Sequence, residues 1–150
     1  MPAPLIYSSE EVKVSFDDET AVMWLGVSIC PSNEKIDHMW TIVSTFLIHH
    51  PEKCILHIAH VDSDSLDPPD INTMLHITGR VLTDFSNVRQ KCKLLIVQPR
   101  FRDEKVDLAS AIFKGIIGSK PRFMIECDQR IIDNEISAIL KKRKERKLTK

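Results

Sequence analysis

The sequence has few glycines and no long apolar segment, and each absence excludes a class of protein. Only four of its 150 residues are glycine, and they form neither a glycine-rich phosphate-binding loop nor the G-x-S-x-G turn of a hydrolase nucleophile. No apolar run approaches the roughly 20 residues that span a bilayer, and the start, MPAPLIYSSEE, lacks the basic stretch and apolar core of a secretory signal. We therefore expect an intracellular, cytoplasmic protein that does not insert into a membrane.

Paired cysteines and clustered metal ligands are also missing. The cysteines are four widely separated residues: Cys30, Cys54, Cys92 and Cys127. They make no C-x-x-C pair, which argues against a zinc ribbon or a thioredoxin-like motif. His57 and His60 are three residues apart on an expected strand, so their side chains point to opposite faces. We expect free thiols in a reducing compartment, no metal site and no cofactor.

The net charge is zero, but the charges are unevenly distributed along the chain. The last ten residues, KKRKERKLTK, contain seven basic residues and one acidic residue, so they carry +6 and residues 1–140 carry −6. One interpretation is a solvated helix end, where cations favour the helix dipole. The other is a tether to nucleic acid, to another polyanion or to a nuclear import receptor. The residues that would form such a contact are Lys141, Lys142, Arg143, Lys144, Arg146 and Lys147.

Hydrophobic periodicity predicts a single α/β domain. Two β-prone runs, residues 11–16 and 20–27, flank the turn formers Asp17 and Asp18 and predict an opening hairpin. After the hairpin, helical patterns alternate with strand-like apolar runs, and the expected order is β-β-α-β-α-β-α-β-α in a mixed, mostly parallel sheet. We expect a loose lead-in at residues 1–10, the domain at 11–140 and a basic tail at 141–150.

The helical patterns and the apolar runs predict which side chains face the core. Nearly continuous apolar runs, typical of strands covered on both faces, occupy residues 54–61 and 93–97, and a last strand is expected at 122–127. Four buried helical stripes are expected. They are Ile36, Met39, Trp40, Val43 and Leu47; Ile71, Met74, Leu75, Thr78, Leu82 and Phe85; Leu108, Ala109, Ile112, Phe113 and Ile116; and Ile132, Ile136, Ile139 and Leu140.

An acidic loop with two hydroxyls follows the first of these apolar runs. The sequence HVDSDSLDPPD, residues 60–70, places four carboxylates there, and ligands of doubly wound sheets gather at such strand ends. An EF-hand calcium loop is excluded, because neither an oxygen ligand at its fifth position nor a glycine at its sixth follows Asp62. Phosphotransfer at Asp62, either metal-dependent or receiver-like with Asp17, Asp18 and Lys120, stays an alternative.

The order of these elements resembles a STAS domain, the fold of anti-sigma-factor antagonists and of the cytoplasmic tails of anion transporters. Four stretches carry the resemblance: VKVSFDDETAVMWLGV for the hairpin, CILHIAHV for the central strand, KCKLLIV for the next strand, and AIFKGIIGSKPRFMIECD for the third helix and the last strand. The resemblance covers about residues 10–140. It implies a non-enzymatic module that binds a protein partner.

The resemblance also implies a switch site. Switching members of the family are phosphorylated on a serine or threonine in an Asp-Ser-Ser-Gly-like segment at the start of their second helix. Two registers are open here: DSDSL makes Ser63 the match, whereas counting back from the apolar stripe of the helix puts Ile71 at the hydroxyl position. The candidate partner-binding and switch residues are Asp62, Ser63, Asp64, Ser65, Asp70 and Asn72.

The sequence therefore predicts a STAS-like interaction or regulatory module without catalytic residues. It would bind a protein partner through the loop after the central strand and the helix that follows, and a homo-oligomer is compatible with this prediction. Two alternatives remain. One is the phosphotransfer protein that uses Asp62, and the other is an accessory or structural protein tethered to polyanions by its basic tail.

Overall fold

The protein folds as a six-stranded sheet with helices on both faces. The computed structural model describes residues 5–9, 12–27, 33–60, 79–80, 90–98, 104–117 and 122–148. Their strands and helices, in chain order, are β1 (Leu5–Ser8), β2 (Val12–Asp17), β3 (Val22–Val27), α1 (Asn33–His49), β4 (Cys54–His60), β5 (Cys92–Gln98), α4 (Glu104–Ile117), β6 (Arg122–Ile125) and α5 (Gln129–Leu148).

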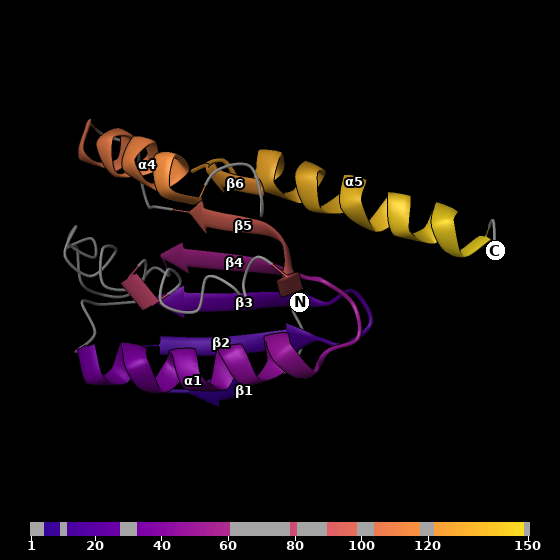
Figure 1. The fold of residues 1–150 in the computed structure, drawn as a ribbon, viewed down its shortest axis with the longest axis horizontal. Coiled ribbons are helices and arrows are strands. Elements are labelled where there is room, and N and C mark those ends of the chain that lie inside the picture. Colours follow the sequence, from indigo (N-terminus) through magenta and orange to yellow (C-terminus); the bar gives the residue numbers. More distant parts are fainter. Residues whose placement is uncertain are drawn as a thin grey trace.

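The strands lie in the sheet in the same order as in the sequence, from β1 to β6 (Figure 1). β1, β2 and β3 pair antiparallel, whereas β3, β4, β5 and β6 run parallel to one another. The carboxyl ends of β3 to β6 therefore meet at one edge of the sheet. The turn between β2 and β3 lies at the other edge, where β4 begins.

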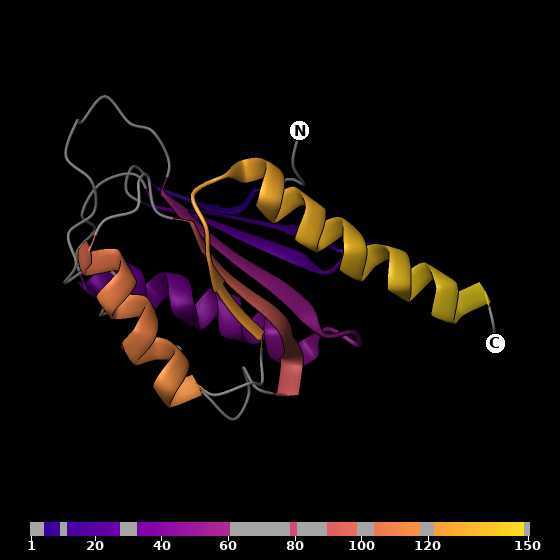
Figure 2. The same cartoon turned by 90° about the horizontal axis from the view of Figure 1, so that it is seen from above.

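Helices cover the two faces unequally. Figure 2 shows α1 and α4 on one face and α5 on the other, crossing the strands. The α1 face holds the larger core, because Val12, Val14 and Phe16 of β2 alternate toward α1. The α5 face holds a smaller core, in which Ile132 of α5 packs on side chains of β4 and β5.

The α/β class, the mixed sheet and the opening hairpin are confirmed. The stripe predicted for α1 is also confirmed, because its five residues, Ile36 to Leu47, are all buried. β4 and β5 are parallel central strands, as their continuous apolar runs predict.

The predicted order of elements is wrong at its start, because residues assigned to a loose lead-in form β1. This strand of four residues adds to the edge of the hairpin, with Tyr7 opposite Val14. The helix predicted over residues 71–85 lies outside the described residues except for Gly79 and Arg80, which are helical. Arg80 Nε lies 3.4 Å from Asp37 Oδ1 of α1.

The prediction for α4 is wrong at two positions. Leu108 and Ile112 were expected to face the core, but they are 62% and 51% exposed. The physical reason is the position of the helix, because α4 packs beside β6, the edge strand of the sheet. A helix at an edge has fewer neighbours to cover its apolar residues.

Candidate interaction sites

The acidic loop predicted as the docking site begins where β4 ends at His60. Its six candidate residues lie outside the described residues: Asp62, Ser63, Asp64, Ser65, Asp70 and Asn72. Because β4 and β5 are parallel, the chain enters this loop at the edge where β5 ends, a few residues before α4 begins. Asp17 and Asp18 lie at the opposite edge, since β2 is antiparallel to β3. That separation disfavours a receiver-like cluster around Asp62.

Among the described residues near this edge, the apolar strip of α4 is the most exposed hydrophobic feature. Leu108 and Ile112 are four residues apart and therefore lie on one side of the helix. Ala111 and Gly115, both exposed, lie beside them. An exposed apolar strip of this kind is typical of a surface that contacts another protein.

The basic segment continues α5 to Leu148, and its charged residues have different surroundings. The side chain of Arg143 is only 14% exposed. Its Nη1 donates to the carbonyl of Thr20 at 2.8 Å, its Nη2 donates to the carbonyl of Lys53, and its Nε lies 3.8 Å from Glu52 Oε2. Arg143 therefore holds α5 against the β2–β3 turn and against the segment before β4.

The other basic residues of the segment are more exposed. Lys147 Nζ lies 3.1 Å from Glu52 Oε1, and hydrogen bonding to this ammonium is the main cause that lowers the pKa of Glu52 below its usual value of 4.5. Lys141, Lys142 and Lys144 are exposed, and the described residues provide none of them with an ion pair. These three lysines are available to contact a polyanion.

A chain of polar side chains crosses the α5 face of the sheet. Gln98 Nε2 donates to Gln129 Oε1 at 3.1 Å, so Gln98 Oε1 is left as the acceptor for His57 Nε2 at 2.7 Å. Gln129 in turn donates to Asp133 Oδ1 at 2.8 Å. Burial lowers the pKa of His57 below its usual 6.5, while the Gln98 hydrogen bond and the Asp133 charge act in the opposite direction. The chain joins β4, β5 and α5 around a histidine that resists protonation.

We expect this histidine to make the fold less stable in mild acid. The unfolded chain takes up a proton at His57 near pH 6.5 and the folded chain only at lower pH, so stability falls as pH drops through 6.5. Urea unfolding midpoints at pH 7.5 and 5.5 should therefore differ less in His57→Gln than in the wild type. His49→Gln, at an exposed histidine, serves as the control and should keep the wild-type difference. If the urea midpoints at pH 7.5 and 5.5 differed by the same amount in all three proteins, His57 would not be the cause of the lower stability in mild acid.

The described cysteines are free thiols, as the sequence predicts. Cys54 and Cys92 are register partners on β4 and β5, and burial raises their pKa values to about 11 and about 12. Such thiols are not nucleophiles near neutral pH. Cys127 is partly exposed, and Cys30 lies outside the described residues.

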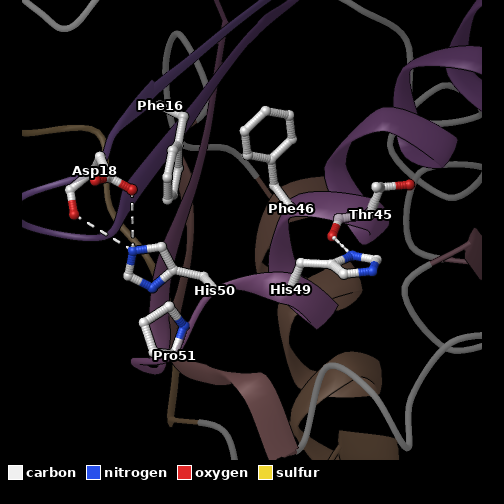
Figure 3. A pocket seen from close by; sticks show the side chains of 7 residues that line it. All are labelled: Phe16, Asp18, Thr45, Phe46, His49, His50 and Pro51. Carbon is white, nitrogen blue, oxygen red and sulfur yellow. Dashed lines mark hydrogen bonds and ion pairs between the residues drawn. The ribbon is translucent and has the colours of Figure 1, made fainter.

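A pocket of about 270 Å³ lies at the carboxyl end of α1. Its walls are the aromatic side chains of Phe16, Phe46, His49 and His50, and Asp18, Thr45 and Pro51 complete the lining (Figure 3). The ring centroid of Phe16 lies 5.3 Å from the ring centroid of Phe46 and 5.2 Å from that of His50. The pocket joins the β2–β3 turn to the end of α1, which sequence patterns within one element do not reveal.

The β2–β3 turn that forms one wall is fixed by its own hydrogen bonds. Glu19 N donates to Asp17 Oδ1 at 3.0 Å, and Ala21 N donates to the Asp17 carbonyl at 2.8 Å. Ala21 takes a left-handed φ of 59°, a conformation that costs a non-glycine residue about 1 kcal/mol. This turn places Asp18 beside His50, with 3.5 Å between Asp18 Oδ1 and His50 Nε2.

No group of three or more His, Cys, Asp or Glu side chains within the described segments could hold a metal ion. In the same part of the chain, no helix combines the length and the apolar character needed to cross a bilayer. Comparisons of the sequence with models of protein families and with curated proteins, and of the structure with solved structures, gave no match.

Proposed function

We propose that the protein is a non-enzymatic module that binds a protein partner at the edge of the sheet where β4 and β5 end. The exposed apolar strip of α4 carries the proposal. Leu108 and Ile112 lie in solvent on a helix that packs beside β6, the outermost strand of the sheet. Burying such side chains stabilises a complex by about 25 cal/mol per Å² of apolar surface. The acidic loop leaves the same edge and would supply the polar rim of the contact.

The resemblance to STAS domains supports the same proposal. Among the described residues, the hairpin of β2 and β3, then α1 and β4, follow one another in the order on which the resemblance rests. A switch by phosphorylation of Ser63 is part of the proposal, since a phosphate beside Asp62 and Asp64 would add about −1.5 to −2 charges to the rim. A reducing intracellular compartment fits the free thiols.

The proposal is tested by making α4 polar and measuring partner binding. Co-purification from the native source identifies the partner, and its affinity is then compared between the wild type and Leu108→Gln/Ile112→Gln. We expect a loss of affinity of about 5- to 150-fold, since two apolar contacts are worth about 1–3 kcal/mol together. Ile131→Gln, at an isoleucine of α5 that is 42% exposed, is the matched control and should keep the wild-type affinity. Equal affinities in all three proteins would exclude α4 as the docking surface.

The phosphotransfer alternative requires a separate test. The purified protein is titrated with Mg²⁺ and with acetyl phosphate, and the product is mapped by mass spectrometry. Saturable Mg²⁺ binding together with phosphorylation of Asp62 would contradict the non-enzymatic proposal. We expect neither, because Asp17 and Asp18 lie at the other end of the strands.

A second candidate function is contact with a polyanion through α5, and the three exposed lysines favour it. We expect weak binding to duplex DNA at about 50 mM salt that is lost by about 200 mM salt. Replacing Lys141, Lys142 and Lys144 with glutamine should abolish this binding without changing the unfolding midpoint. Binding that survives the triple replacement would require another basic surface. The same variant tests whether the lysines direct nuclear import.

A further inference from the structure

The exposed side of α4 changes in chemical character along the helix. Glu104 and Asp107 lie in the first turn, and Lys114 lies in the last turn. Leu108 and Ile112 lie between these charges. All five side chains are exposed. This side of the helix is therefore acidic at its start, apolar in its middle and basic at its end.

Small residues beside Leu108 leave room for a close contact. Ala111 follows Leu108 by three positions and Gly115 follows Ala111 by four, so the three lie on one side of the helix. A Cβ added at Gly115 would meet nothing within 4 Å in the part of the chain that the structure describes. Figures 1 and 2 show α4 at the periphery of the fold. A second helix can therefore approach this side to the roughly 8–10 Å that separates packed helices.

The opposite charges of Asp107 and Lys114 lie on the same flank of this side. They are seven positions apart, which is nearly two full turns of an α-helix. When two copies of a helix pack antiparallel about a two-fold axis, each flank meets the same flank of the other copy. When they pack parallel, each flank meets the opposite flank. An antiparallel pair therefore brings Asp107 of each copy to Lys114 of the other, whereas a parallel pair does not.

We propose that the partner at this edge is a second copy of the same chain, whose α4 packs antiparallel against the first. Placing Leu108 opposite Ala111 of the second copy puts a large side chain over a small one, and the same register brings Asp107 beside Lys114. Two-fold symmetry forms each of these contacts twice. The use of α4 rests on the proposed function, whereas the choice of a second copy rests on the pattern of charge and size.

Sedimentation equilibrium of the purified protein between about 5 and 500 μM tests the proposal. We expect a weak dimer, because one pair of helices buries less than the about 1,200 Å² of a standard interface. Leu108→Gln/Ile112→Gln should weaken the dimer at least about fivefold, and Ile131→Gln should keep the wild-type affinity. A dimer that survives the double substitution would overturn the proposal. A monomer at every concentration would also overturn it, while the proposed function would stand if a co-purified partner still lost affinity in the double variant.

Exchanging the two charges tests the antiparallel pairing itself. Asp107→Lys and Lys114→Asp should each weaken self-association at least about fivefold, since two attractive ion pairs become repulsive. An equimolar mixture of the two variants should regain the wild-type affinity, because each copy then faces opposite charges. Lys144→Asp, at an exposed lysine of α5, is the control and should leave the dimer unchanged. A mixture that dimerised no better than either variant alone, or an equal loss in Lys144→Asp, would overturn the pairing.

Discussion

Replacing Arg143 with alanine is expected to lower the free energy of unfolding by about 2–3 kcal/mol, since hydrogen bonds from charged groups contribute about 1.5–3 kcal/mol. The guanidinium donates to the carbonyls of Thr20 and Lys53, which belong to two different connections of the sheet. Alanine would leave both carbonyls without this donor and would remove a cation from beside Glu52. Urea unfolding followed by circular dichroism measures the effect.

Two further variants separate the geometry of Arg143 from its charge. Arg143→Lys keeps the charge but cannot reach both carbonyls with one planar group, so we expect it to lose at least half as much stability as alanine. Lys144→Ala removes a charge from the next position, which is exposed, and should change stability by less than about 0.5 kcal/mol. Equal effects of Arg143→Ala and Lys144→Ala would show that Arg143 does not hold the helix in place.

The role of Arg143 also determines how the polyanion hypothesis can be tested. Deleting residues 141–150 would remove the exposed lysines together with Arg143, so a loss of DNA binding could reflect loss of structure. Replacing Lys141, Lys142 and Lys144 keeps the contacts of Arg143 with Thr20 and Lys53. The triple variant therefore changes charge while the end of α5 stays docked.

Two kinds of element could be predicted from the hydrophobic pattern of the sequence. They are strands that are covered on both faces of the sheet and helices that bury one regular apolar stripe. β4 and β5 are apolar on both sides because α1 and α5 lie on opposite faces of the sheet. The stripe of α1 is buried as predicted because this side of the helix packs on β2 and belongs to the larger core of the sheet. In both cases the layers packed directly on the element determine the burial of every residue in the pattern.

The misses arise where burial depends on a neighbour that is distant in sequence. Periodicity shows that Leu108 and Ile112 share a side of α4, but only the position beside β6 shows that this side is exposed. β1 is short and gains its hydrogen bonds from β2, so its own residues carry little signal. The α1 pocket depends on contacts between His50 and Asp18, which are 32 positions apart.

The sequence contains a pattern that predicts the buried position of Arg143, although this residue lies within the basic run. Arg143 follows Ile132 by eleven positions and Ile136 by seven, and both spacings return to the same side of a helix. The position therefore continues the stripe that faces the sheet. Charge composition alone grouped Arg143 with neighbours that face solvent.

The start of α5 is expected to depend on Ile132 as strongly as its end depends on Arg143. Ile132 is fully buried against Ile55, Leu94 and Ile96. Ile132→Ala would leave a cavity in the smaller core, and replacements of this kind cost about 2–5 kcal/mol. The nearby bidentate pair of Arg122 with Glu135, at 2.7 and 3.0 Å, is exposed and contributes little to holding this end of the helix, so we assign the effect to Ile132.

Ile131 provides a matched control for this prediction, because it is the same residue type one position earlier and is 42% exposed. Both substitutions to alanine change the intrinsic helix propensity equally, so the difference between them measures burial. We expect Ile131→Ala to stay within about 0.5 kcal/mol of the wild type, while Ile132→Ala lowers the urea midpoint clearly. If the two variants unfolded at the same urea concentration, α5 would not be packed on the sheet through Ile132, and the smaller core would not contribute to holding the helix.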